Sequence, residues 1–279
     1  MYKSGLVPIN RNLTEESIMN NKPKMILTDL DGTLICSDGS ISERTKSILK
    51  SCQNQGIYVV IATARYWIGA ERYIEEIHPD YEITTDGTLI HRHGEQIYSC
   101  NLEIEDTNQI IQDILARDDK TEITVAAGRQ VFWNSKHISE SEKLHKAVYY
   151  DYRKPLTCQA NKIVVELSDD ETALEIANKN HCRLQSYRGE KWYAFLPETA
   201  GKVRAIRELA KILNISLSDI VAFGDDKNDM EMLQICGTGV AVANAIPDVK
   251  DIADSVTLSN DENGVAEWLV KNVLLSGEE

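Results

Sequence analysis

Two carboxylates one residue apart follow the apolar run Lys24–Thr28. They are Asp29 and Asp31, in the segment Asp29–Thr33, which reads DLDGT. An ionised carboxylate can act as a nucleophile or a metal ligand without an activating base, and a neighbouring carboxylate can then transfer protons. The alternative is structural, because Asp-Gly between apolar runs also favours a hairpin turn. The segment is therefore a candidate catalytic centre, with a turn as its competing interpretation.

A second group of acids follows the apolar run Ile220–Phe223. It combines three carboxylates and one amide at the expected start of a helix: Asp225, Asp226, Asn228 and Asp229. Acids in a first helical turn interact favourably with the helix dipole, which would account for one or two of them without any ligand. Three acids after one strand favour a bound cation, and oxygen ligands of this kind suit Mg²⁺.

Two further positions could hold an anion. Thr63 and Ala64 follow the apolar run Ile57–Ala62, where a hydroxyl and backbone N–H groups could bind a phosphate, although Thr63 could equally be an ordinary N-cap. Lys202 falls in the first turn of an expected helix, where a cation is unfavourable unless an anion lies nearby. Alone, it could also be a solvent-exposed lysine. Together with the carboxylates, these groups could perform phosphoryl transfer.

The elements around these residues alternate between strand and helix, as in a parallel sheet. Near the start, a helix over Ser42–Gln55 ends at Gly56 and precedes a buried strand over Ile57–Ala62. Helices and strands alternate again later in the chain. We expect helices over Gly201–Leu213, Asn228–Ile235 and Pro247–Ala253 and strands over Ile220–Phe223 and Gly239–Val242. Because ligands bind at the carboxyl ends of such strands, the segments above should share one edge. The sequence predicts an α/β fold with a doubly wound, Rossmann-like parallel-sheet core.

The middle of the chain has a different pattern. Strand-like segments at Glu122–Ala127, Val131–Trp133, Ile163–Leu167 and Trp192–Leu196 are interleaved with helices near Glu105–Ala116 and Glu171–Asn180. This pattern predicts an inserted α+β cap domain over residues 87–195. The core would then comprise residues 23–86 and 196–279, preceded by a loose tail over residues 1–22.

Composition limits the classes of protein and partner. Apolar residues make up 42% of the 279 residues and charged residues 27%, as in ordinary globular proteins. The net charge of −14 disfavours nucleic acid as a partner, because a phosphate backbone would be repelled. No apolar run is long enough to span a membrane or resembles a secretory signal, and the six cysteines form no C-x-x-C pair. We therefore expect a cytoplasmic protein with reduced thiols that acts on a small molecule.

The four segments, in this order, resemble the haloacid dehalogenase-like phosphatases, and closely the Cof-like subfamily, which carries a large cap between the second and third motifs. The resemblance rests on DxDGT, Thr63-Ala64-Arg65, the isolated Lys202 and GDDxND, and it extends to Gly239–Ala245 and Ser259–Ala266. It covers nearly the whole chain from Lys24 onward. It implies a Mg²⁺-dependent phosphatase of small soluble phosphomonoesters that forms an aspartyl-phosphate. A hexose-phosphate mutase and a non-catalytic sensor of a phosphorylated ligand are the alternatives.

The resemblance also implies a role for each motif residue. Asp29 would be the nucleophile and Asp31 the general acid and base. The metal ligands would be a carboxylate oxygen of Asp29, the backbone carbonyl of Asp31, and Asp225 with Asp226 or Asp229. The phosphoryl oxygens would be bound by Thr63, Lys202, Asn228 and the backbone N–H groups of Leu30 and Ala64.

Two positions depart from the subfamily pattern. Ala64 stands where the subfamily usually has glycine, which adds a methyl group beside the expected phosphate. Asp86, in Asp86-Gly87-Thr88, stands where the subfamily usually has asparagine, which adds an acid at the expected hinge between core and cap. Substrate specificity is expected from the cap, with an expected hairpin tip over Tyr187–Trp192 contributing Arg188, Lys191 and Trp192.

Overall fold

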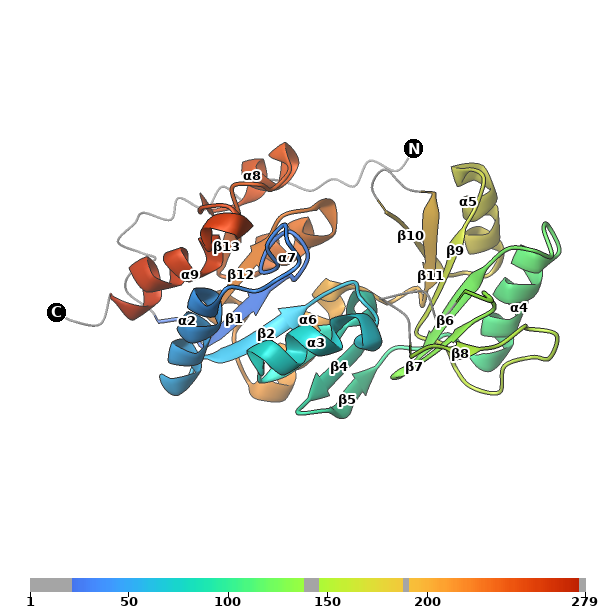
Figure 1. Cartoon of the computed structure of the whole chain (residues 1–279), viewed down its shortest axis with the longest axis horizontal. Coiled ribbons are helices and arrows are strands. Elements are labelled where there is room, and N and C mark those ends of the chain that lie inside the picture. Colours follow the sequence, from blue (N-terminus) through green and yellow to red (C-terminus); the bar gives the residue numbers. More distant parts are fainter. Residues whose placement is uncertain (1–21, 138–145, 188–190, 276–279) are drawn as a thin grey trace. The chain divides into compact units, whose positions relative to one another are not determined.

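The computed structural model describes residues 22–137, 146–187 and 191–275 (Figure 1). Backbone contacts divide the chain into two compact units. Unit 1 comprises Met1–Ile61, Glu76–Asp80 and Leu209–Glu279, and unit 2 comprises Ala62–Glu75 and Tyr81–Glu208. Both acidic segments lie in unit 1, whereas Thr63, Ala64 and Lys202 lie in unit 2.

Unit 1 is built on a parallel sheet with the strand order β14-β13-β12-β1-β2. The strands are β1 (Met25–Thr28), β2 (Tyr58–Ala62, whose last residue begins unit 2), β12 (Ile220–Gly224), β13 (Thr238–Ala241) and β14 (Ser255–Val256). Strand β1 is buried along its whole length between β12 and β2. Burial on both faces explains why these strands have continuous apolar sequences rather than alternating ones.

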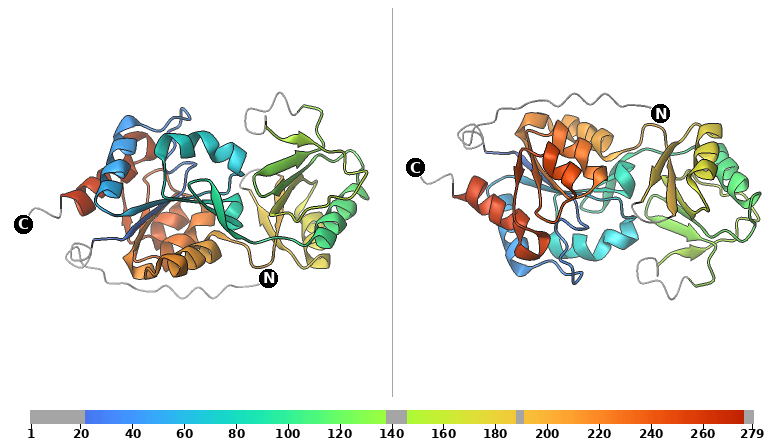
Figure 2. Two further views of the ribbon diagram at one scale, coloured as in Figure 1. Left: turned by 90° about the horizontal axis from the view of Figure 1, so that it is seen from below. Right: turned by 90° about the horizontal axis from the view of Figure 1, so that it is seen from above.

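Helices cover both faces of this sheet. Helices α2 (Glu43–Asn54) and α9 (Gly264–Leu269) lie on one face, and α7 (Met230–Ile235) lies on the other (Figure 2). The remaining elements are α8 (Pro247–Ile252), the short helices η3 (Leu217–Asp219), η4 (Lys227–Asp229) and η5 (Asn260–Glu262), and a closing π-helix, η6 (Val270–Leu274). The predicted doubly wound parallel sheet is therefore confirmed.

Unit 2 begins with a small antiparallel meander. Its strands are β3 (Tyr81–Thr84), β4 (Leu89–Arg92) and β5 (Glu95–Ser99), and the short helix η1 (Thr85–Gly87) connects β3 to β4. Helices α3 (Trp67–Ile77) and α6 (Lys202–Leu213) each begin in unit 2 and end in unit 1. The start of α6 places Lys202 in a first helical turn, as predicted.

The rest of unit 2 is a six-stranded sheet with the order β10-β11-β9-β6-β7-β8. The strands are β6 (Ile123–Ala127), β7 (Gln130–Trp133), β8 (Val148–Tyr149), β9 (Lys162–Glu166), β10 (Arg183–Ser186) and β11 (Trp192–Leu196). All pairs are antiparallel except β7 with β8. Helices α4 (Ile104–Leu115) and α5 (Asp170–Lys179) cover one face of this sheet (Figures 1 and 2). The predicted α+β architecture is confirmed, and its boundaries at residues 87 and 195 remain a prediction.

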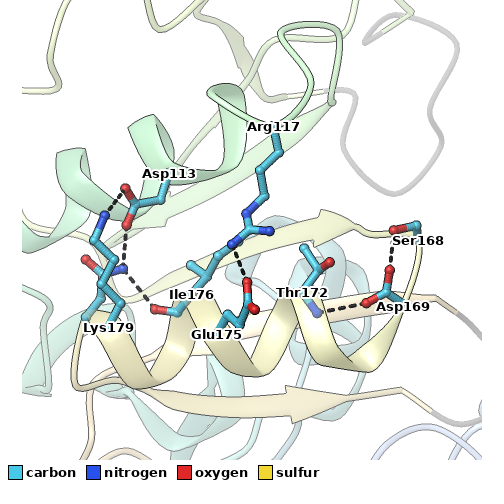
Figure 3. Close-up of polar contacts among 9 residues, drawn as sticks. Asp113, Arg117, Ser168, Asp169, Thr172, Glu175, Ile176 and Lys179 are labelled. Carbon is cyan, nitrogen blue, oxygen red and sulfur yellow. Dashed lines mark hydrogen bonds and ion pairs between the residues drawn. The ribbon is translucent and has the colours of Figure 1, made fainter.

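Helices α4 and α5 lie side by side, joined by polar contacts at their surface (Figure 3). Asp113 of α4 accepts hydrogen bonds from Lys179 (2.7 Å) and Asn180 (2.9 Å), and Arg117 pairs with Glu175 at 2.7 Å. Exposed pairs of this kind contribute only about 0–1 kcal/mol each. The apolar residues beneath them, including the fully buried Ile110, therefore contribute most to the stability of this layer.

Within the part of the chain that the structure describes, no helix combines the length and the apolar character that crossing a membrane requires.

Candidate active site

Three carboxylates from distant parts of the sequence converge in unit 1. Asp29, Asp225 and Asp229 each offer one oxygen, and these oxygens all lie within 4.8 Å of one another. Asp29 and Asp229 are buried, and Asp225 is half-buried. Several ionised carboxylates at such distances repel one another unless a cation compensates their charge. This acidic cluster could therefore bind a metal ion.

Asp29 reaches the cluster because it directly follows β1. Its backbone N–H donates to the carbonyl oxygen of Phe223 in β12 (3.1 Å), which continues the sheet pairing by one residue. The chain then curls tightly, since the Leu30 carbonyl accepts hydrogen bonds from the backbone N–H groups of Thr33, Leu34 and Ile35. The Asp-Gly segment is thus a turn. It does not connect two strands of a β-hairpin, because Asp31 and Ile35 form a single parallel bridge rather than an antiparallel ladder. The hairpin interpretation is therefore wrong.

The two acidic segments are packed directly against each other. The Thr33 hydroxyl donates to Oδ1 of Asp225 at 2.7 Å. Gly32 has φ +73°, and a Cβ added there would lie 2.4 Å from Oδ2 of Asp225. Asn244 completes the contact by donating to the Gly32 carbonyl at 2.7 Å. The glycine and threonine of the DLDGT motif therefore position Asp225, which composition and spacing alone did not indicate.

Asp229 is held by the backbone of its own segment. Its Oδ2 accepts from the N–H groups of Asp225 (3.1 Å) and Asp226 (3.3 Å). The Asp226 side chain accepts in turn from the backbone N–H of Asp229, so Asp226 and Asp229 form a capping box at the start of η4. Asp226 also accepts from the N–H of Lys227 at 2.8 Å. Helix capping thus accounts for Asp226. Asp229 caps the helix and also belongs to the acidic cluster.

The remaining predicted site residues of unit 1 have different exposures. The Leu30 side chain is fully buried. Only its backbone N–H was predicted to contact a ligand, so this burial agrees with the prediction. Asp31 and Asn228 are exposed to solvent. Their positions leave both side chains accessible to a substrate, and their roles remain predictions.

Thr63 and Ala64 occupy a structured loop of unit 2. The N–H of Thr63 donates to Ile83 of β3 (2.9 Å), and the Thr63 hydroxyl accepts from the N–H of Arg65 (3.1 Å). Thr63 therefore stabilises a local turn of this loop, but it does not cap a helix, because α3 begins only at Trp67. The N-cap interpretation of Thr63 is wrong. Contact of Thr63 with a phosphate stays a prediction.

The start of α6 is buried and closely packed. Lys202 is only 6% exposed, so the interpretation of a solvent-exposed lysine is wrong. A Cβ on Gly87 would lie 2.5 Å from the backbone of Gly201 and 2.6 Å from the backbone nitrogen of Lys202. The turn Asp86-Gly87-Thr88, where we expect the hinge, therefore packs directly against Gly201 and the backbone of Lys202.

The expected specificity hairpin is partly described. β10 and β11 pair antiparallel, and the N–H of Tyr187 donates to the Trp192 carbonyl at 3.3 Å. Lys191 is exposed and Trp192 is half-buried. Arg188 lies outside the described residues.

Comparisons with known proteins agree with these features. The family model described as haloacid dehalogenase-like hydrolase matches residues 26–269. A 5-amino-6-(5-phospho-D-ribitylamino)uracil phosphatase of Bacillus subtilis, YwtE, is 29% identical over 91% of this chain and 99% of its own length. The phosphatase YwpJ of the same organism is 28% identical over 88% of this chain and 98% of its own length. A solved haloacid dehalogenase-like hydrolase of Bacteroides thetaiotaomicron superposes with a TM-score of 0.76 at 26% identity, covering 90% of this chain and 99% of that one.

Proposed function

Because this chain belongs to the haloacid dehalogenase-like hydrolases, as a Cof-like phosphatase, we propose that it is a Mg²⁺-dependent phosphatase of small soluble phosphomonoesters. The observation that carries this proposal is the acidic cluster, which joins the DLDGT and GDDKND segments at the carboxyl ends of adjacent strands. Asp31, two residues after Asp29, is exposed to solvent and so accessible to a substrate.

The acidic cluster suits Mg²⁺. Asp29, Asp225 and Asp229 offer hard oxygen ligands, and we propose that the Asp31 carbonyl adds another, with Asp226 supporting Asp229 through the capping box. When bound, the ion would offset the negative charge of Asp29 and of the phosphoryl group. The buried position of Asp29 also limits its access to bulk water, which strengthens these electrostatic effects.

The proposed reaction proceeds in two steps at Asp29. First, a carboxylate oxygen of Asp29 attacks phosphorus to form an aspartyl-phosphate, and Asp31 donates its proton to the departing oxygen. Second, Asp31 takes a proton from water as the water oxygen attacks phosphorus. The Asp29–phosphorus bond breaks, inorganic phosphate leaves, and both carboxyl groups return to their starting protonation states.

From the resemblance to the family, we propose that the phosphoryl oxygens are bound by Thr63, Lys202, Asn228 and the backbone N–H groups of Leu30 and Ala64. β1 and β2 run parallel, with Thr28 opposite Ile61, so the chain leaves both strands at the same edge of the sheet. The backbone N–H of Leu30 follows β1, and Thr63 and Ala64 follow β2. Together with Asn228 and the Lys202 ammonium, they would stabilise the charge that develops during transfer.

The cap, which we place at residues 87–195, would then select the leaving group. Arg188, Lys191 and Trp192 are the proposed specificity residues. Among small phosphomonoesters, sugar phosphates, flavin mononucleotide and pyridoxal phosphate are the candidate substrates that we propose to test. The name of the relative YwtE adds a phosphorylated ribityl compound to this panel.

The proposal is tested by hydrolysis of p-nitrophenyl phosphate with Mg²⁺ and with a chelator. We expect turnover only with Mg²⁺, and a loss of about 10³-fold or more in kcat for Asp29→Asn. Free phosphate release without isomer formation from hexose phosphates distinguishes the phosphatase from the mutase. Phosphate binding without any turnover would identify a sensor and contradict the proposal.

A further inference from the structure

A buried ion pair in unit 2 connects three segments that the proposed mechanism depends on. The Lys162 ammonium lies 2.5 Å from Oδ2 of Asp86, and both side chains are only 4% exposed. The same ammonium donates to the backbone carbonyl of Ala64 at 3.0 Å. Asp86 also accepts from Gln185 (2.9 Å) and Tyr187 (3.3 Å), which belong to β10 and the residue that follows it.

Aromatic rings enclose the ammonium. Its nitrogen lies 4.9 Å from the ring centroid of Tyr66 and 5.1 Å from that of Tyr187. Burial raises the pKa of Tyr66 above its usual range, and its hydroxyl has no hydrogen-bond partner among the described residues. This surrounding excludes water and strengthens each electrostatic contact that Lys162 makes. Lys162 is therefore held in one place rather than solvated.

The backbone at Asp86 is also constrained. Asp86 has φ +56° and ψ +31°, a left-handed conformation that is unfavourable for a residue with a Cβ. The next residue, Gly87, has φ +81° and packs against Gly201 and Lys202, where no Cβ would fit. Such strain persists where the surrounding contacts fix the backbone. The pair thus holds the turn that packs against the start of α6.

Stability alone does not explain this pair. Desolvating two charges costs several kcal/mol per ion, so a buried pair is often no more stabilising than apolar residues of similar size. The contacts of the pair suggest a different role. Lys162 donates to the Ala64 carbonyl, and the backbone N–H of Ala64 is proposed to bind phosphate. Asp86 begins the turn that packs against Lys202.

We infer that Asp86 and Lys162 are positioning residues that fix the phosphate-binding groups of unit 2. This inference rests on the proposed function of Thr63, Ala64 and Lys202. Lys162 sets the orientation of the Ala64 peptide, and Asp86 sets the position of both Lys162 and the Gly87 turn. Neither residue needs to touch the substrate. Without them the loop and the start of α6 would bind a phosphoryl group less tightly, because their groups would no longer be oriented in advance.

The test compares phosphate affinity with stability in three variants: Lys162→Met, Asp86→Asn, and the two changes combined. Inorganic phosphate binding is measured by calorimetry in the presence of Mg²⁺, and stability by thermal unfolding. Each single variant leaves one buried charge without its partner, so both should lose stability. The double variant removes both charges and should recover most of that stability. Because it still lacks the donor to Ala64, its dissociation constant for phosphate should remain raised about tenfold or more.

Lys179→Met is the matched control, since it also breaks a Lys–Asp pair of unit 2. That pair lies on the surface that α4 and α5 share (Figure 3). This variant should leave phosphate affinity unchanged. If the affinity of the double variant recovers together with its stability, or if Lys162→Met binds phosphate as tightly as the wild type, the inference is wrong. These outcomes differ from failure of the proposed function, in which Asp29→Asn would retain Mg²⁺-dependent hydrolysis.

Discussion

Gly32 occupies a position where both the backbone and the available space exclude a side chain. Its φ of +73° disfavours any residue with a Cβ, and that Cβ would lie 2.4 Å from Oδ2 of Asp225. Gly32→Ala should therefore displace an acid of the cluster. We expect the variant to lose Mg²⁺ affinity by about tenfold or more and about 1–3 kcal/mol of stability.

Gly56→Ala is the control for Gly32→Ala, because Gly56 has a similar φ of +79° but no atom within 4 Å of an added Cβ. It should cost about 1–2 kcal/mol of stability and leave Mg²⁺ affinity unchanged. Calorimetric Mg²⁺ titration and thermal unfolding measure both effects. Equal Mg²⁺ affinities in the two variants would show that contact with Asp225 is unimportant.

His91 should make stability depend on pH. It is 1% exposed, and burial, with a smaller contribution from the charge of Arg129, lowers the pKa of His91 to about 4. The unfolded chain, with a pKa of 6.5 at this residue, binds the proton more tightly than the folded chain does. The contribution of the neutral imidazole is thus complete above pH 6.5 and is lost as the pH falls toward 4. It amounts to at most about 3 kcal/mol.

The measurement is denaturant unfolding of the wild type and His91→Gln between pH 4 and pH 7. The wild type should lose more stability than the variant as the pH falls, so the two curves should converge toward pH 4. His78→Gln, which changes an exposed histidine, should follow the wild type. If stability depends on pH in the same way in the wild type and in His91→Gln, His91 is not the source of the pH dependence.

At the scale of elements, the six-stranded sheet depends on the apolar faces of α4 and α5 rather than on their surface ion pairs. Ile110 of α4 is fully buried in the core beneath the sheet. Ile110→Ala should lower the free energy of unfolding by about 2–5 kcal/mol, because it leaves a cavity. Mg²⁺ affinity should not change, because the acidic cluster belongs to unit 1. Leu174→Ala, at a residue that is 51% exposed, is the control. It should lower the free energy of unfolding only slightly, as measured by chemical denaturation of both variants.

The elements that the sequence predicted best were those with a clear apolar pattern and a clear end. The helix predicted over Ser42–Gln55 spans Glu43–Asn54, and the strand predicted over Trp192–Leu196 has those bounds in the structure. The meander β3-β4-β5 was not predicted, because its short strands mix polar and apolar residues, unlike the continuous apolar run of β1. The helix predicted over Asn228–Ile235 is divided, with η4 preceding α7, since the Asp226–Asp229 capping box shapes its first turn.

At the scale of the whole molecule, local motifs indicated which residues meet at the acidic cluster, but not how they are held. Spacing after two apolar runs predicted that Asp29 and Asp225 share one sheet edge, and they do. The contacts of Thr33 and Gly32 with Asp225, and the burial of Lys162 against Asp86, depend on tertiary packing. No local pattern encodes such contacts between residues far apart in the sequence.

Mg²⁺ should also stabilise the whole molecule. The chain has a net charge of −14, and three of its carboxylates converge in the acidic cluster. An ion that binds only the folded state stabilises it by about 2.7 kcal/mol at a hundred times its dissociation constant. Thermal unfolding in Mg²⁺ should therefore occur at a higher temperature than in a chelator. Asp225→Asn should abolish most of this difference, and an undiminished difference would place the ion elsewhere.

The most direct test of the central claim is mass spectrometry of the peptide Met25–Arg44 after incubation with Mg²⁺ and p-nitrophenyl phosphate. Asp31→Asn is the variant to use, because p-nitrophenolate leaves without an acid, whereas water attack then lacks its base. We predict a phosphoryl group on Asp29, and none in Asp29→Asn. Release of p-nitrophenol without a phosphoryl group on Asp29, or with one on another residue, would contradict the account.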